Sequence, residues 1–154
     1  MCPPRVACPE DTYGATPGLE TCTACTANAG TDGATGEVAV GACLCNAGYE
    51  GELATAEDTC GECPLGTWLA EVGPGPCTPC TANAITAAAA SVAITDCLCN
   101  VGHSGTIAEP EDVCAACELA EYKDATGPGD CTPCPALSTT EEEASTVRPH
   151  TARL

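Results

Sequence analysis

The chain has 154 residues, of which 16 are cysteines, three are tyrosines, one is a tryptophan and none is a phenylalanine. Large apolar side chains are therefore too few to fill one common hydrophobic core, and a cysteine content this high is typical of a disulfide-stapled scaffold. The net charge of −18, from 22 acidic and 4 basic residues, excludes ordinary nucleic-acid binding, because such a chain repels phosphates.

The cysteines recur in the same order and spacing with a period of about 54 residues, which indicates an array of small units. The first set is Cys8, Cys22, Cys25, Cys43, Cys45 and Cys60, the second is Cys63, Cys77, Cys80, Cys97, Cys99 and Cys114, and the third is Cys117, Cys131 and Cys134. This spacing predicts the end of a preceding unit at 1–7, a first repeat at 8–62, a second at 63–116, and an incomplete third repeat with a tail at 117–154.

Each repeat opens with an aromatic residue five positions after its first cysteine. These aromatics are Tyr13, Trp68 and Tyr122. We interpret them as lids that pack over a neighbouring disulfide, with ligand stacking as the alternative. A glycine ten positions after the same cysteine predicts a tight turn with positive φ, which glycine adopts most readily. These glycines are Gly18, Gly73 and Gly127.

The middle of each complete repeat is rich in threonine and alanine and ends in alternating small aliphatic residues, which predict a short strand. These residues are Val38 and Val40 in the first repeat, and Val92 and Ile94 in the second. A Cys-Leu-Cys-Asn segment follows, and after it a Gly-x-x-Gly turn in which Tyr49 corresponds to His103. We interpret Tyr49 as a packing residue of this turn.

These motifs resemble known extracellular modules. The segment from Cys63 to Trp68 and the Gly-Pro-Gly-Pro-Cys-Thr-Pro-Cys segment ending at Cys80 resemble the ephrin-receptor-like repeat, and are similar to the first submodule of tumour-necrosis-factor-receptor repeats. The Cys-Leu-Cys-Asn-x-Gly-x-x-Gly segments resemble the second half of an epidermal-growth-factor-like domain. Together the repeats resemble those of large surface proteins of protists and algae. The acidic pattern of calcium-binding modules is missing, so the resemblance implies no calcium site.

Six cysteines can pair in many ways, and we expect each to pair with a near neighbour. The expected pairs are Cys8–Cys22, Cys25–Cys43, Cys45–Cys60, Cys63–Cys77, Cys80–Cys97, Cys99–Cys114 and Cys117–Cys131. The epidermal-growth-factor-like alternative crosses the first four cysteines of a repeat and keeps only Cys45–Cys60 and Cys99–Cys114. Cys2 and Cys134 are left unpaired or available for bonds between units.

Zinc is the competing use of these thiols. The spacing of Cys60, Cys63, Cys77 and Cys80 is close to that of a four-cysteine zinc ribbon, and Cys114 to Cys134 repeats it. The Cys-x-Cys pairs fit no such site, and four thiolates on one zinc ion would add negative charge to an already acidic chain. We therefore expect structural disulfides, and neither a metal nor another cofactor.

The fold class expected is small and disulfide-rich: an elongated tandem array of short β-hairpin and turn modules without a common hydrophobic core. Dense disulfides persist in oxidising surroundings, so the expected location is extracellular or at the cell surface. Residues 1–30 show no signal peptide, and no apolar run is long enough to span a membrane. The chain is thus expected to be a mature piece or a fragment of a longer protein.

Enzyme chemistry finds no support, since the two histidines are His103 in a turn and His150 in the tail, with no catalytic set around either. The first hypothesis is a structural building block of an extracellular rod or filament. Its partners would be other copies or flanking repeats, with divalent cations or O-linked glycans as further candidates. The alternative is the stalk or ligand-binding ectodomain of a cell-surface receptor or adhesin.

The redox state is directly testable. We predict at least seven intramolecular disulfides and no stoichiometric metal, because the cysteines recur in a spacing suited to short cross-linked loops. Intact mass with and without reduction, combined with elemental analysis, measures both quantities. One zinc ion for every four cysteines would contradict the prediction and the extracellular location together.

Overall fold

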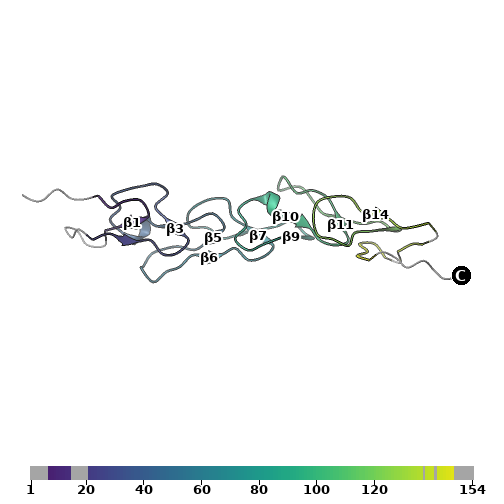
Figure 1. The fold of residues 1–154 in the computed structure, drawn as a ribbon, viewed down its shortest axis with the longest axis horizontal. Helices are drawn as coiled ribbons and strands as arrows, with labels where there is room; N and C mark the ends of the chain where they lie inside the picture. Colours follow the sequence, from purple (N-terminus) through teal and green to yellow (C-terminus); the bar gives the residue numbers. More distant parts are fainter. Residues whose placement is uncertain (1–6, 15–20, 137, 141, 148–154) are drawn as a thin grey trace, which may run out of the picture. The chain divides into compact units, whose positions relative to one another are not determined.

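The computed structural model describes residues 7–14, 21–136, 138–140 and 142–147 (Figure 1). Its regular elements are very short. The strands are β1 (Thr12–Tyr13), β2 (Thr23–Ala24), β3 (Ala29–Gly30), β4 (Leu44–Cys45), β5 (Tyr49–Glu50), β6 (Gly61–Glu62), β7 (Thr67–Trp68), β8 (Thr78–Pro79), β9 (Ala84–Thr86), β10 (Cys97–Cys99), β11 (His103–Ser104), β12 (Ala115–Ala116), β13 (Glu121–Tyr122) and β14 (Thr132–Pro133). Two 3-10 helices, η1 (Val40–Ala42) and η2 (Ile94–Asp96), complete the described part. The small disulfide-rich class with short antiparallel strands is confirmed.

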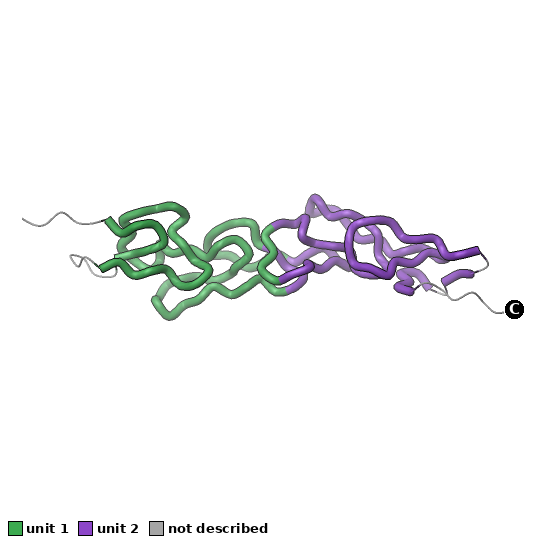
Figure 2. The backbone as a smooth tube through the Cα atoms, in the orientation of Figure 1, with its two compact units in different colours: residues 1–64, 69–78, 89–92 green, residues 65–68, 79–88, 93–154 purple. Residues whose placement is uncertain are grey.

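The described residues form two compact units, coloured green and purple in Figure 2. The first unit holds the described residues within Met1–Pro64, Leu69–Thr78 and Ala89–Val92, and the second holds those within Leu65–Trp68, Pro79–Ala88 and Ala93–Leu154. The first unit therefore includes both ends of the opening disulfide loop of the second sequence repeat, Cys63 and Cys77, and all of that loop except Leu65–Trp68. Contacts in the folded chain join the end of one repeat to the beginning of the next.

Antiparallel pairs of strands recur in both units. The first unit contains β1 with β2, β3 with β4, and β5 with β6. The second contains β9 with β10, β11 with β12, and β13 with β14. The pairing of Tyr49 with Glu62 in the first unit matches that of His103 with Ala116 in the second. The repeat of the sequence is therefore also a repeat of strand register.

Each unit has a small core of its own, built largely of disulfide sulfur. In the first unit Tyr13 and Leu53 are buried with two half-cystines. In the second unit Ile107 is buried among three half-cystines, and Trp68 packs against this cluster. The half-cystines are Cys43 and Cys45 in the first unit, and Cys97, Cys99 and Cys114 in the second. Separate small cores agree with the scarcity of large apolar residues.

The strands predicted from the alternating aliphatic residues are wrong. Val40 begins helix η1 and Ile94 begins helix η2, where a short strand was expected. Val38 and Val92 are 68% and 46% exposed, so the alternation does not line a buried face of a pleated strand. The Asp96 carboxylate accepts the N–H of Ala93 at 3.0 Å, which favours a tight turn at this place.

The first glycine of each Gly-x-x-Gly turn is required by its surroundings. Gly48 has φ +82° and Gly102 has φ +75°. A Cβ at Gly48 would overlap the carbonyl oxygen of Ala90, and one at Gly102 would overlap that of Ala144. The same glycines accept N–H groups from the following repeat, Cys63 onto Gly48 and Cys117 onto Gly102, both at 2.9 Å. The turn therefore brings two backbone segments closer than a side chain allows.

Replacing Gly48 with alanine should destabilise the first unit by about 2–3 kcal/mol, because the new Cβ adds backbone strain and a clash with a carbonyl group. Denaturant unfolding with the disulfides intact measures the change. Gly75→Ala is the matched control, since Gly75 has open space around its Cα and should tolerate a methyl group. Equal stability of the two variants would show that the close backbone approach at Gly48 does not affect the free energy of unfolding.

Candidate functional site

The disulfides are the chemical feature that organises the described residues. They are Cys8–Cys22, Cys25–Cys43, Cys45–Cys60, Cys63–Cys77, Cys80–Cys97, Cys99–Cys114 and Cys117–Cys131. Each joins near neighbours 14 to 18 residues apart, so the crossed epidermal-growth-factor-like pairing is not the one adopted. A cross-link that closes a loop of this length contributes about 3 kcal/mol in the chain-entropy model.

The four cysteines with zinc-ribbon spacing do not act together. Cys60 pairs with Cys45, Cys63 with Cys77, and Cys80 with Cys97, so the four sulfur atoms belong to three different disulfides. Over the described ranges, no group of three or more His, Cys, Asp or Glu side chains is arranged to hold a metal ion. These four cysteines therefore form structural cross-links and are not arranged as the ligands of one metal ion.

In the first two repeats the aromatic residue after the first cysteine packs on disulfides, as the sequence predicts. For Tyr122, which is half-buried in the third repeat, this packing role stays a prediction. Tyr13 is 4% exposed and lies in the core cluster of the first unit, which the cystine Cys25–Cys43 also contacts. Trp68 packs in the same manner on the cluster of the second unit. Tyr49 also packs against the first cluster, which confirms its interpretation as a packing residue. Gly18, by contrast, lies outside the described residues.

Sequence reasoning missed a buried threonine that recurs in all three repeats. Thr31, Thr86 and Thr140 are 3%, 2% and 6% exposed. The hydroxyl of each accepts a backbone N–H from a residue 20 positions earlier, at 3.0 Å in every case. In the first two repeats the hydroxyl also donates to a carbonyl group, that of Ala34 and that of Ala88. Each threonine thereby connects two segments that no disulfide joins directly.

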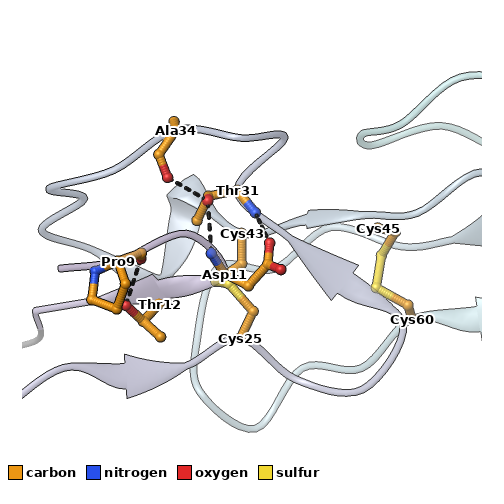
Figure 3. Close-up of a disulfide and its surroundings, with 9 residues drawn as sticks. All are labelled: Pro9, Asp11, Thr12, Cys25, Thr31, Ala34, Cys43, Cys45 and Cys60. Atoms are coloured by element: carbon orange, nitrogen blue, oxygen red, sulfur yellow. Dashed lines mark hydrogen bonds between the residues drawn. A yellow bond between two sulfur atoms is a disulfide. The ribbon is translucent and has the colours of Figure 1, made fainter.

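The N–H groups that these threonines accept come from a left-handed turn. The donors are Asp11, Gly66 and Ala120, with φ of 60°, 84° and 67°. Figure 3 shows the first case, where the Asp11 carboxylate also accepts the N–H of Thr31 at 3.1 Å, next to the cystine Cys25–Cys43. The threonine is common to the three repeats while the donor residue varies. Superposing the repeats on one another would have identified it.

Two aspartates with the same place in successive repeats close a surface turn. Asp58 accepts the N–H groups of Ala54 and Thr55 at 2.9 and 2.6 Å. Asp112 accepts those of the corresponding Ala108 and Glu109, both at 2.8 Å. These backbone donors, with that of Thr55 first for Asp58 and that of Ala108 first for Asp112, hold the pKa of each carboxyl below its usual value. Both aspartates are thus turn residues of the hairpin.

Lys123, the one basic residue between Val6 and Val147, is buried. Lys123 is 8% exposed, and its Nζ donates to the carbonyl oxygen of His103 at 2.8 Å and to that of Gly127. Burial lowers the pKa of this amine below its usual value, and the nearby charge of Asp130 opposes the shift. The ring of His103 makes a local contact at the surface, where Nδ1 lies 3.1 Å from the carbonyl oxygen of Val101.

Cys134 is the one cysteine of the described ranges without a disulfide, and it is half-buried. Its N–H donates to the carbonyl oxygen of Ala120 at 2.7 Å, as that of Cys80 donates to Gly66 at 2.8 Å. The thiol therefore lies in the same local framework as its paired counterpart. Cys2 and His150 lie outside the described residues.

No helix in the described part of the chain is long and apolar enough to cross a membrane. The features that recur from repeat to repeat have structural roles. They are the disulfides, the packed aromatic residue, the hydroxyl of the buried threonine and the aspartate of the surface turn. The geometry offers a cross-linked framework that recurs from repeat to repeat.

Comparison with known proteins agrees with this framework. The family described as tyrosine-protein kinase ephrin type A/B receptor-like matches residues 51–97 and 105–150, together more than half of the chain. The protein named ephrin type-B receptor 3, from Gallus gallus, is 43% identical over 75 residues. That alignment covers 49% of this chain and 7% of the length of the relative. The receptor similarity and the many disulfides point to an extracellular or cell-surface location.

The buried threonine should contribute measurably to stability. Replacing Thr86 with valine keeps its shape but leaves the N–H of Gly66 without its acceptor, which should cost about 1–3 kcal/mol. Chemical denaturation monitored by Trp68 fluorescence measures the loss. Thr132→Val is the matched control, because Thr132 is exposed on β14 and the change should be close to neutral. A Thr86 variant as stable as the control would show that water replaces the hydroxyl without cost.

Proposed function

We propose a function from the premise that this chain belongs to the family of tyrosine-protein kinase ephrin type A/B receptor-like proteins. The function proposed is that of a non-enzymatic, cysteine-rich segment in the extracellular part of a cell-surface receptor or adhesin. The observation that carries it is the match of the family to two successive repeats, 51–97 and 105–150. A relative named as a receptor shares the same type of segment.

The comparisons support this reading better than the rod or filament that the sequence analysis placed first. The filament hypothesis is based on the identical spacing of successive repeats and on the lack of a catalytic set or a concentrated recognition surface, and these features serve both kinds of protein. The family match covers the cysteine-rich segment, so we propose no kinase activity for these residues. The chain spans only a small part of the length of the relative it matches.

Within a receptor, the role that the geometry supports best is that of a spacer or stalk. The same staple, lid and buried hydroxyl recur from repeat to repeat, which keeps the local structure constant while the surface varies. The large apolar side chains that are exposed in the described residues include Leu65 at 57% and Leu119 at 58%, which hold equivalent positions in two repeats. Recognition of a ligand by the stalk itself is the second candidate role. The acidic surface would favour a basic partner.

The test is where the native protein lies and in which form. Antibodies raised against the folded chain should label intact, unpermeabilised cells, and mild detergent should release the antigen as discrete particles in a sedimentation gradient. Reduced and alkylated chain serves as the control antigen that such antibodies should not bind. Antigen found in long fibres that pellet after detergent treatment would favour the filament. Antigen found only after permeabilisation would contradict both readings.

A further inference from the structure

A buried amine holds a place in the third repeat where the second repeat has an aliphatic side chain. Lys123 directly follows β13, as Leu69 directly follows β7. The backbone hydrogen bonds of the two residues correspond. The carbonyl oxygen of Lys123 accepts the N–H of Gly102 at 2.8 Å, and the N–H of Lys123 donates to the carbonyl oxygen of Ser145 at 3.1 Å. In the same way, the carbonyl oxygen of Leu69 accepts the N–H of Gly48 at 2.8 Å, and the N–H of Leu69 donates to the carbonyl oxygen of Ser91 at 3.0 Å. The difference between the two places therefore lies in the side chain.

The amine of Lys123 joins two segments of the second unit. One carbonyl that it contacts, His103 O, belongs to β11, and the other, Gly127 O, belongs to the loop of residues 124–130 between β13 and β14. A leucine at this place has no group that can bind either oxygen. The side chain thus connects the hairpin of the second repeat to a loop of the third.

Besides the amine, the 124–130 loop is held by backbone hydrogen bonds at Gly127 and Gly129 and by the disulfide of Cys131, which follows it. Asp124, Ala125 and Thr126 are exposed, whereas Gly127 is buried and donates its N–H to the carbonyl oxygen of Cys99 at 2.9 Å. The bridge between Gly105 and Gly129 is long, at 3.4 Å. The amine of Lys123, bound to Gly127 O in the loop and to His103 O in β11, is therefore a side-chain link between the two.

The corresponding loop of the first unit, residues 70–76, is held by a different side chain. Glu50 of β5 accepts the N–H of Cys77 at 2.9 Å and so fixes the end of that loop. In the second unit Ser104 takes the place of Glu50, and its side chain is too short for the same reach. The carboxylate of Glu50 thus fixes the 70–76 loop to the β5–β6 hairpin, and the amine of Lys123 fixes the equivalent 124–130 loop to the β11–β12 hairpin.

We propose that Lys123 is a charged clamp, whose amine holds the 124–130 loop on β11 and performs in the second unit the task that Glu50 performs in the first. Burying an ammonium group against neutral carbonyls carries a desolvation cost that leucine avoids. The clamp therefore acts on the local order of the loop more than on the global stability of the unit. Asp130, at the end of the loop, is the charged group that favours the ammonium form.

Lys123 is the only lysine of the sequence, which gives a direct readout of the clamp. Acetylation of the native, disulfide-intact chain with an amine-specific reagent, followed by peptide mass mapping, reports how often the amine leaves its place. We expect the folded chain to be labelled at least about 10-fold more slowly than the reduced and unfolded chain. Equal labelling rates would overturn the proposal, and this measurement needs no variant.

The second measurement is amide hydrogen exchange of the loop in Lys123→Met. Loss of the two charge-assisted hydrogen bonds should speed exchange at Gly127 by about 10- to 100-fold, with little change at Asn100 of the same unit. The matched control is Leu69→Met, which introduces the same side chain at the equivalent place and should leave the 70–76 loop unchanged. Unchanged exchange at Gly127, or an equal increase at Gly127 and Asn100, would each overturn the clamp.

Discussion

Each cysteine that is cross-linked in the described structure is bound to a near neighbour, and this constraint sets the scale of everything else. Loops of 14 to 18 residues must return to their starting point, so strands can be only two or three residues long. Because half-cystines fill much of the interior, one aromatic residue and one aliphatic residue complete each small core, as Tyr13 and Leu53 do in the first unit. The staples replace the core that the composition cannot supply.

Short closed loops also determine which residues are needed at their turns. Gly48 and Gly102 combine a positive φ with a close approach to the next repeat, and no residue with a Cβ fits there. Thr31, Thr86 and Thr140 satisfy backbone donors that neither a strand nor a disulfide reaches. Hydroxyl and carboxylate side chains thus pair with backbone N–H groups that a regular strand ladder would satisfy in a larger domain.

The proposed function agrees with the constancy of this framework. The disulfides, the buried threonines and the turn aspartates recur with the repeat, and the family match likewise covers two successive stretches of the chain. Features that differ, such as Glu50 against Ser104 and Leu69 against Lys123, lie where one repeat meets the next within a unit. A receptor segment built in this way can vary its junctions and surface while the scaffold is retained. The extracellular location agrees with the many cross-links.

The sequence by itself determined the disulfide-rich class, the repeat, the packing role of Tyr13, Trp68 and Tyr49, and the glycine turns, because spacing and residue type are read directly from the chain. It misassigned the aliphatic alternation before Cys43 and Cys97, since period two does not distinguish a strand from an exposed turn. Only the tertiary structure decided between neighbour and crossed pairing, revealed the buried threonines, and placed the amine of Lys123 on two carbonyls. Those features depend on which distant backbone groups meet. The recurrence of the threonine can be read by superposing the repeats, but the hydrogen bonds that its hydroxyl makes cannot.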